Sequence, residues 1–380
     1  MAPNVPAHEL LHGGAAFIPA LVRAIREART SVHLETYVFA TDEVGYEVLQ
    51  ALAAATANGA TVCVVADWLG TGRNRSTQVA RALQAAGVQF RSFNPWFVRG
   101  VARTHRKMCV VDSRVAFIGG INLVDDLHSA WGPETLPFPR WDFALRLEGP
   151  VVGDMQADMQ AQWSRLGRLS WLSRIGLYRE SLLRSGPHRQ GGPVSFVCCD
   201  NLHNRLTIQA TYLEAIRRAR HRILLANPYF APGRTFRDAL AAAAARGVEV
   251  RLLLGVGQYR LQDAVARSYY AKLLRAGVIL AEYRRTQLHA KVAVIDDDWV
   301  TIGSSNCDGL SLFVNQEANV VVRDRSLADD LARHILSGMA QSVRVDASVW
   351  RRSVWRRFKD GLAFLAYRGV MRVITWNAFQ

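Results

Sequence analysis

An internal repeat is the feature that most constrains how this chain can fold. Residues 104–122 read THRKMCVVDSRVAFIGGIN, and residues 288–306 read LHAKVAVIDDDWVTIGSSN. Counted from the histidine, both copies place a lysine at +2, an aspartate at +7, a glycine at +14 and an asparagine at +17. Agreement at five polar or conformationally special positions is far beyond chance, so two homologous lobes are predicted.

The order of elements around each motif supports this duplication. Residues 31–92 alternate apolar, β-branched runs with helical segments that end in glycine, and residues 222–277 repeat the same order. The pattern predicts α/β lobes with mixed sheets. Residues 70–74 (GTGRN) are interpreted as a connecting loop. We expect a first lobe at 1–165, a basic connector at 166–193, a second lobe at 194–345 and a basic amphipathic tail at 346–380.

The charge of the chain narrows the class of partner. Lys plus Arg number 47 against 32 for Asp plus Glu, which gives a net charge of +15. Such an excess indicates an anionic partner, either phospholipid headgroups or nucleic acid, although a basic surface can also serve solubility alone. Half of the residues are hydrophobic, so a large core can be buried.

Cysteine usage and hydropathy bear on location. The five cysteines are scattered and contain no Cys-x-x-Cys pair, which argues against a disulfide framework and a cysteine-rich zinc site. Reduced cytoplasmic thiols are the simpler interpretation. The N-terminal segment does not look like a signal peptide, and no run of about 18 uncharged apolar residues appears. Any meeting with a membrane is therefore predicted to occur from its surface.

The two motifs carry groups suited to phosphate chemistry. In a strand, residues i and i+2 point to the same face, so His105 projects with Lys107, and His289 with Lys291. Imidazole can act as a nucleophile, an acid or a base, and an ammonium can hold phosphate oxygens. The amides at the +17 positions follow glycine-rich turns and could donate to phosphate, as could one serine that stands where the first copy has glycine. These candidate phosphate-binding residues are Asn122, Asn306 and Ser304.

Four carboxylates complete the candidate set. Asp112 and Asp296 define the motif, but their odd offset and turn-like surroundings indicate a structural role. A catalytic histidine needs an acceptor on its second nitrogen. Asp142 lies at +37 from His105, and Glu317 lies at +28 from the histidine of its own lobe, in corresponding places. The duplication favours a histidine-orienting role for both, although each could equally form a salt bridge at the rim. No His-Glu-x-x-His or clustered carboxylate set indicates a metal site.

At these residues the sequence resembles the phospholipase D superfamily, whose signature is His-x-Lys, four residues, Asp, six residues, then Gly-Gly or Gly-Ser-x-Asn. The closer similarity is to bacterial cardiolipin synthases of the short form, the cardiolipin synthase B type. It rests on the phrases HRKMCVVDSRVAFIGGIN, FALRLEGPVV, LHAKVAVIDDDWVTIGSSNCDGLSL and NQEANVVV. The resemblance covers nearly the whole chain.

The resemblance implies two lobes related by a pseudo-twofold axis, with both motifs in one shared active-site cleft. It implies that one histidine, expected to be His105, attacks phosphorus and forms a phosphohistidine. The other, His289, would protonate the leaving alcohol and deprotonate the incoming one. Lysines and asparagines would hold the charge on the non-bridging oxygens, so no metal and no cofactor are expected.

Two partner classes remain, because the superfamily also contains nucleases. From Trp350 onward the tail places aromatic and aliphatic residues at helical spacing with arginines between them, which suits a membrane interface or packing on the lobes. Nucleic acid is the less favoured partner, because the apolar residues fall on one helical face. The expected function is cardiolipin synthesis from two phosphatidylglycerol molecules, peripherally on the cytoplasmic face of the bacterial membrane. The alternative is a phospholipase D-type hydrolase or an endonuclease.

One loop is expected to form an apolar wall that excludes water from the site. It reads WGPETLPFPRWDF and contains Trp131, Phe138 and Trp141, although these side chains could merely pack the loop.

Overall fold

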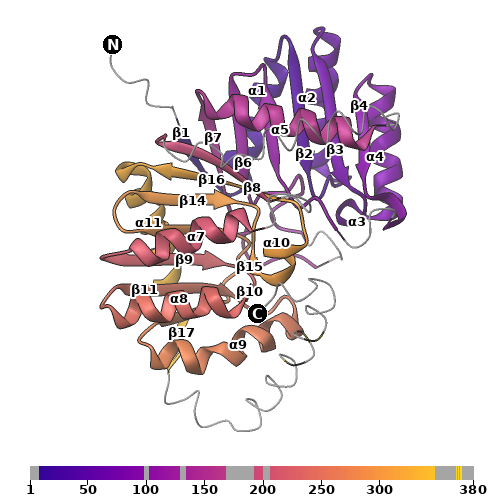
Figure 1. The fold of residues 1–380 in the computed structure, drawn as a ribbon. Helices are drawn as coiled ribbons and strands as arrows, with labels where there is room; N and C mark the ends of the chain where they lie inside the picture. The colour runs from indigo at the N-terminus through magenta and orange to yellow at the C-terminus, as the bar shows by residue number, and fades with distance from the viewer. Residues whose placement is uncertain are drawn as a thin grey trace, which may run out of the picture.

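Two large sheets, each flanked by helices, form most of the molecule (Figure 1). The computed structural model describes residues 8–97, 102–128, 134–167, 192–199 and 206–346, together with residues 365, 367 and 369. Most of the tail and of the connector, including Trp350, lies outside the described residues, as does Trp131. Within the described part of the chain, no helix is long and apolar enough to cross a bilayer.

The first lobe contains a seven-stranded sheet in the order β1-β7-β6-β5-β2-β3-β4. Its strands are β1 (His8–His12), β2 (Ser31–Thr36), β3 (Thr61–Asp67), β4 (Gln89–Phe93), β5 (Met108–Val111), β6 (Val115–Gly119) and β7 (Phe143–Glu148). Its helices are α1 (Gly14–Arg26), α2 (Glu43–Ala57), α3 (Trp68–Thr71), α4 (Arg73–Ala85), the 3-10 turn η1 (Pro95–Phe97) and α5 (Val151–Leu166). Strands β2, β3 and β4 are parallel, and the other pairings are antiparallel.

The second lobe contains an eight-stranded sheet in the order β17-β12-β11-β9-β13-β14-β16-β8. Its strands are β8 (Val194–Cys199), β9 (Arg222–Asn227), β11 (Glu249–Gly255), β12 (Ile279–Tyr283), β13 (Val292–Ile295), β14 (Trp299–Gly303), β16 (Glu317–Arg323) and β17 (Val343–Arg344), and a separate pair is formed by β10 (Phe230–Ala231) and β15 (Cys307–Asp308). Its helices are α7 (Thr207–Arg218), α8 (Arg234–Ala245), α9 (Arg260–Arg275), α10 (Gly309–Phe313) and α11 (Arg325–Ala340).

The two sheets have the same topology, which confirms the predicted α/β duplication. Reading inward from β1 or from β8, each sheet places its strands in the same spatial and sequential order. Among the described strands of these two sheets, only the small edge strand β17 has no counterpart. Helices α2, α4, α8 and α9 are each followed by a glycine with positive φ, as their sequences predict.

The segment expected to be a loop at 70–74 is instead helical, and this expectation was wrong. The Asp67 carboxylate accepts hydrogen bonds from the N–H groups of Leu69 (3.0 Å) and Gly70 (2.8 Å) and so begins α3. Gly72 then joins α3 directly to α4, which begins at Arg73. The capping aspartate, which ends β3, compensates for the two glycines that made this stretch look irregular.

A hydrophobic core common to both lobes joins them. It contains Met108 and Phe143 from the first sheet, Val292 from the second, and residues of α5 and α11, such as Met155 and Ile335. Separate apolar clusters lie under α1, α2 and α4 in the first lobe and under α7, α8 and α9 in the second. Both sheets therefore bury both faces, which explains why their strands read as nearly continuous apolar runs.

Candidate active site

The two lobes exchange short backbone segments where the motifs begin. The His105 N–H donates to the Gln316 carbonyl (2.9 Å), and the Gln316 N–H donates to the Arg103 carbonyl (2.7 Å). The reciprocal contact joins the His289 N–H to the Trp141 carbonyl (2.9 Å). Each histidine is thus held beside the residue that precedes the carboxylate of the other lobe, an arrangement consistent with the predicted pseudo-twofold relation.

This exchange gives each histidine a carboxylate from the opposite lobe. His105 Nδ1 lies 3.0 Å from Glu317 Oε2, and His289 Nδ1 lies 2.6 Å from Asp142 Oδ2. Both carboxylates were identified from the sequence, but each was counted from the histidine of its own lobe. The structure shows that each carboxylate contacts the histidine of the other lobe, because the backbone next to it, at Gln316 or Trp141, is hydrogen-bonded across the lobe boundary.

The hydrogen-bond partners set the tautomer of each ring. His105 Nδ1 also lies 3.0 Å from the Ser304 carbonyl oxygen, and since both neighbours are acceptors, Nδ1 carries the proton. His289 Nδ1 likewise faces a carboxylate. Burial raises the pKa of Asp142, but Lys291 and His289 outweigh this and hold the pKa below its usual value, so the carboxylate is ionised. Both rings therefore present an unprotonated Nε2.

Ser304 has a different role from the one predicted. Its hydroxyl donates to Glu317 Oε2 (2.5 Å) and accepts from the Ala318 N–H (3.0 Å), and the residue is fully buried. It therefore holds the carboxylate that holds His105. At Gly120, which occupies the corresponding place in the first lobe, a Cβ atom would lie 2.2 Å from Asp142 Oδ1. Asp142, whose side chain is shorter than that of Glu317, occupies the space that a side chain at position 120 would fill.

Two buried lysines place positive charge in the site, which favours the binding of an anion. Lys107 Nζ donates to the His105 carbonyl (2.6 Å), and Lys291 Nζ donates to the His289 carbonyl. Burial and the neighbouring Lys291 lower the pKa of Lys107 well below its usual value. Burial likewise lowers the pKa of Lys291 to about 8, against the opposing pull of the carboxylates. Bringing an anion between the ammonium groups would relieve this repulsion.

The imidazoles respond to the same surroundings. Burial lowers the pKa of His289 to about 3, with Lys291 adding to the effect and Asp142 opposing it. Burial also lowers the pKa of His105, against the opposing charge of Glu317. Both rings are therefore neutral in the empty site at pH 7, the state in which a histidine can act as a nucleophile or a base.

The two asparagines flank this arrangement differently. Asn122 is half-buried, and its Oδ1 accepts from the Val38 N–H (3.3 Å), which leaves its amide group as a donor. Asn306 is buried, and its Oδ1 has no hydrogen-bond partner within the described part of the chain. Tyr37, which sequence analysis missed, packs edge-on against His105 with ring centroids 4.8 Å apart. Its position directly after β2, at the carboxyl end of a parallel strand, was the available signal.

Two aromatic residues of the loop that was expected to exclude water, Trp141 and Phe138, differ in their burial. Trp141 is buried and stacks edge-on against Phe143, with ring centroids 4.8 Å apart, so it belongs to the shared core. Phe138 is 45% exposed and lies under the Arg285 guanidinium, 4.4 Å from its Cζ. Only Phe138 of these two is therefore free to contact a ligand or a surface.

Asp112 and Asp296 lie in turns and accept hydrogen bonds from the backbone at the start of β2 and β9. The Asp112 carboxylate accepts from the N–H groups of Arg29 (2.8 Å), Thr30 (2.8 Å) and Ser31 (3.0 Å). Asp296 accepts from the N–H groups of 220–222 in the same way. Both have positive φ (52° and 53°), a conformation that aspartate tolerates better than most residues. They belong to the motif without belonging to the site.

We expect Asp112→Ala to lower the free energy of unfolding by about 1–3 kcal/mol, because several backbone donors lose their acceptor. The activity of the folded fraction should not change. Urea unfolding followed by circular dichroism measures the first quantity, and activity per folded molecule the second. Asp297→Ala is the control, because its side chain is 57% exposed and should contribute less than about 0.5 kcal/mol. A loss of activity without a loss of stability in Asp112→Ala would contradict this assignment.

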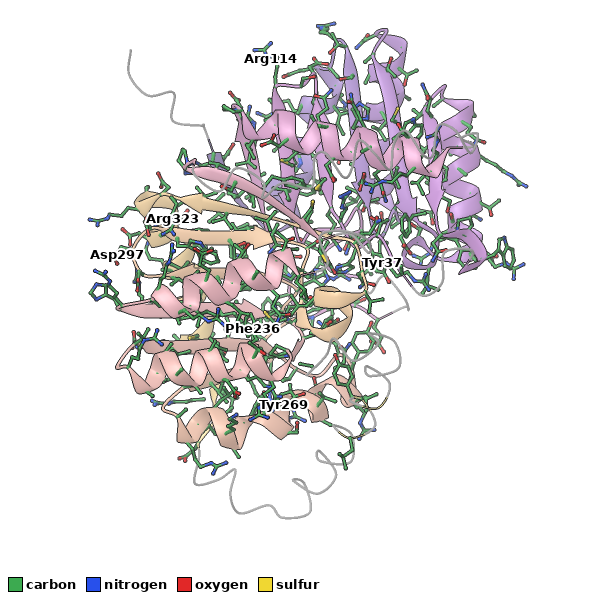
Figure 2. All side chains as sticks on the ribbon, in the orientation of Figure 1. Tyr37, Arg114, Phe236, Tyr269, Asp297 and Arg323 are labelled. Carbon is green, nitrogen blue, oxygen red and sulfur yellow. The ribbon has the colours of Figure 1, made fainter. Side chains whose placement is uncertain are left out.

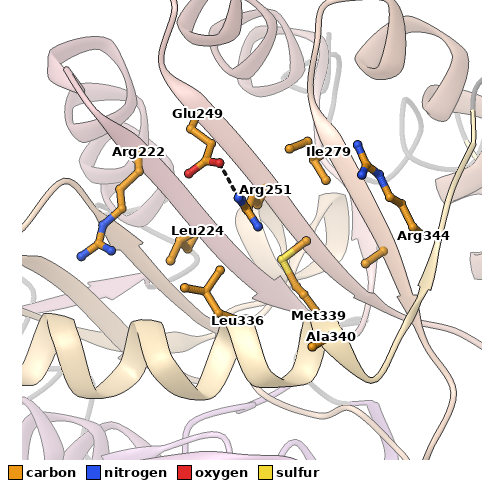
Figure 3. Close-up of a pocket in the computed structure, with 10 residues that line it drawn as sticks. Arg222, Leu224, Glu249, Arg251, Ile279, Leu336, Met339, Ala340 and Arg344 are labelled. Atoms are coloured by element: carbon orange, nitrogen blue, oxygen red, sulfur yellow. Dashed lines mark hydrogen bonds and ion pairs between the residues drawn. The ribbon is translucent and has the colours of Figure 1, made fainter.

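A separate pocket lies away from the histidines, between α11 and the first residues of β9, β11 and β12 (Figure 3). It has a volume of about 450 Å³, an aliphatic floor and three arginines, of which Arg251 is paired with Glu249 (2.5 Å). It contains none of the predicted site residues. Among the described residues, no group of three or more histidine, cysteine or acidic side chains could hold a metal.

Comparison with known proteins agrees with the duplicated fold. A family profile described as "Cardiolipin synthase, PLD-like domain" matches residues 21–128 and 212–338. Cardiolipin synthase B of Escherichia coli K12 is 37% identical over 97% of this chain and 89% of its own length. The minor cardiolipin synthase ClsB of Bacillus subtilis is 28% identical over 88% of this chain and 81% of its own length.

Among solved structures, phosphatidylserine synthase of Haemophilus influenzae superposes with a TM-score of 0.70, covering 97% of this chain and 94% of that one. At 14% identity, this likeness concerns the fold alone. The fold and the paired His-Lys motifs define a two-lobed phospholipase D-like protein. The chain belongs to the cardiolipin synthase family of phospholipase D-like proteins.

Proposed function

We propose that this protein transfers a phosphatidyl group between two phosphatidylglycerol molecules, which yields cardiolipin and glycerol. The observation that carries the proposal is the pair of oriented imidazoles, one from each lobe, beside two buried lysines. Similarity over nearly the whole chain to cardiolipin synthase B supports the choice of lipid. Since phosphatidylglycerol resides in bilayers, we place the reaction at the membrane surface, with the protein bound peripherally.

In the first step, His105 Nε2 attacks the phosphorus of the donor lipid and forms a phosphatidyl-histidine. The bond from phosphorus to the glycerol headgroup oxygen breaks, and a protonated His289 gives its Nε2 proton to that oxygen. In the second step, neutral His289 removes the proton of an acceptor hydroxyl on another phosphatidylglycerol. That oxygen attacks phosphorus, the bond to His105 breaks, and His289 is left protonated while the product is bound; it loses that proton when the product leaves.

The protonation of His289 depends on the substrate. In the empty site its pKa is about 3, and repulsion from Lys291 is one cause. A bound phosphodiester places negative charge beside both lysines and counteracts this repulsion, so its arrival favours imidazolium next to the leaving oxygen. Lys107, Lys291 and the amides of Asn122 and Asn306 are proposed to hold the non-bridging oxygens, whose charge grows in the transition state.

We expect kcat/KM to fall with rising pH above about 8, because free enzyme loses the Lys291 proton near that pH and then binds an anion less well. The fall should approach tenfold per pH unit. The measurement uses a phosphodiester with a nitrophenol leaving group, which needs no acid assistance. In Lys291→Arg the maximum value of kcat/KM should be lower than in the wild type. The decrease of kcat/KM at high pH should begin only beyond pH 9, because a guanidinium stays charged. A wild-type profile that stays flat to pH 9.5 would contradict the assignment.

Product analysis tests the proposed reaction. With vesicles in which phosphatidylglycerol is the only reactive lipid, we expect cardiolipin and free glycerol in equal amounts. Transfer can outrun hydrolysis only if the site positions the acceptor and limits water. Phosphatidic acid as the main product at every lipid density would instead identify a hydrolase. Cleavage of single-stranded DNA, with phosphatidylglycerol left intact, would identify a nuclease.

A further inference from the structure

Exposed large apolar side chains are unevenly distributed over the described surface. Ten are exposed among the described residues. Seven of them lie in segments that leave or enter the sheets at the end where the histidines lie: Leu206, which follows β8, and Leu69, Trp96, Leu127, Phe138, Tyr259 and Leu261. These segments follow β3, β4, β8 and β11 or connect β6 to β7, so they come from both lobes.

The opposite ends of the sheets differ sharply. The turns there carry exposed polar and charged side chains such as Arg114 and Asp297. Figure 2 shows these two residues, together with Arg323, at the outer ends of the lobes, whereas Tyr37 lies where the lobes meet. Within the described part of the chain, none of the large exposed apolar residues lies in the turns at 112–114 or 296–298. The apolar surface is therefore specific to the histidine end.

A continuous chain of contacts links the most exposed indole to the site. The Trp96 ring is 61% exposed and lies 5.1 Å from the ring of Trp68, at the start of α3. In the same short helix, a Cβ at Gly70 would meet the Tyr37 ring at 2.6 Å, so α3 packs directly on Tyr37. Tyr37 in turn packs on His105. Trp96 also has a positive φ of 56°, which a bulky residue rarely adopts.

The second lobe presents an equivalent edge. Tyr259 is 48% exposed and lies 5.7 Å from the ring of Tyr229, which follows β9 at the histidine end. Leu261 is 58% exposed, and Arg260 between them is exposed as well. Each lobe therefore contributes exposed apolar side chains at the histidine end.

Arginines accompany the exposed rings. The Arg73 guanidinium lies 4.1 Å from the centre of the Trp96 ring, and Arg285 lies 4.4 Å from that of Phe138. Both arginines are exposed. Aromatic rings next to guanidinium groups suit the headgroup region of a bilayer, where the ring enters the boundary and the cation meets lipid phosphates.

We infer that this surface, formed by Leu69, Trp96, Phe138, Tyr259 and Leu261 with their neighbouring arginines, docks on an anionic bilayer and presents the histidines to the lipid headgroups. The inference rests on the proposed function, since a lipid donor and a lipid acceptor must both reach the site. It names a membrane contact within the folded lobes, separate from the tail.

The test compares vesicle binding with turnover of a dispersed substrate. We expect the double variant Trp96→Ala/Tyr259→Ala to bind vesicles of phosphatidylcholine and phosphatidylglycerol at least about tenfold less tightly in a sedimentation assay. Its kcat/KM on a short-chain phosphatidylglycerol, kept below its micelle concentration, should stay within about twofold of the wild-type value, because neither side chain touches the reacting groups. Trp96→Phe should retain most of the binding.

The controls are Val343→Ala, an exposed apolar residue on the edge strand β17, and Arg114→Gln, an exposed arginine at the opposite end. Neither should weaken vesicle binding. Wild-type vesicle affinity in the double variant would overturn the inference. An equal loss of vesicle binding in the two control variants would overturn it as well. The same holds if the double variant retained vesicle binding but lost affinity for single-stranded DNA. If the wild type bound vesicles through this surface but converted no phosphatidylglycerol, the inference would stand and the proposed function would fail.

Discussion

Replacing either His105 or His289 with alanine is expected to lower kcat by about 10³-fold or more, although the two residues lie 184 positions apart. Each ring is held by a carboxylate of the other lobe and supplies a role that the other cannot fill at the same moment. If one histidine attacks phosphorus and the other transfers the proton, removing either one prevents the catalytic cycle from being completed with the natural substrate. Cooperating groups of this kind lose nearly all their benefit when one member is lost.

Cardiolipin formation from labelled phosphatidylglycerol measures this effect. His128→Ala is the matched control, because the His128 side chain is exposed and pairs with Asp125 (2.9 Å), outside the site, so its loss should change kcat less than twofold. Thermal unfolding of each variant would show whether the protein still folds. Undiminished turnover in His289→Ala would contradict a shared site and favour a reaction run by the first lobe alone.

Asp142→Asn and Glu317→Gln are each expected to lower kcat by about 10²–10⁴-fold. Both changes preserve shape but remove the charge that stabilises imidazolium and fixes the proton on Nδ1. Ser304→Ala should cost less, about tenfold, because it removes one donor to Glu317 and leaves the carboxylate in place.

Nuclear magnetic resonance of labelled histidine separates this positioning role from general damage. The Nδ1 proton of His289 should lose its strongly hydrogen-bonded signal in Asp142→Asn and keep it in Glu317→Gln. His105 should show the reverse. If each carboxylate variant altered the signal of the histidine in its own lobe, the crossed pairing would be wrong.

The sequence predicted which residues form the site more completely than it predicted which of them contact one another. The repeat spacing identified both His-Lys pairs, and the odd offset of Asp112 indicated the turn in which the structure places it. Asp142 and Glu317 could be found because each stands at the head of an apolar run at a corresponding place: Asp142 directly precedes β7, and Glu317 begins β16. Their crossed partners could not, because the pairing arises from backbone exchange between the lobes at Gln316 and Trp141. No local pattern encodes that contact.

Ser304 shows a second limit of the sequence. A serine beside a glycine-rich turn reads as a phosphate ligand, and only the packing of Ala318 and Glu317 around its hydroxyl reveals a different task. The distribution of exposed aromatics was equally invisible, since Trp96 and Tyr259 lie 163 positions apart in unrelated loops. The predicted roles of the tail and the connector remain predictions, because those residues are mostly outside the described ranges.

Trapping the covalent intermediate tests the central claim most directly. The His289→Ala variant is incubated with a phosphatidyl ester of nitrophenol labelled with ³²P, quenched in alkali to preserve phosphohistidine, digested and mapped by mass spectrometry. The good leaving group makes the first step independent of the missing acid, and the second step lacks its base, so the label should accumulate on His105. Release of nitrophenol with no label on His105, in this variant and in the wild type alike, would contradict a phosphatidyl-histidine at that residue.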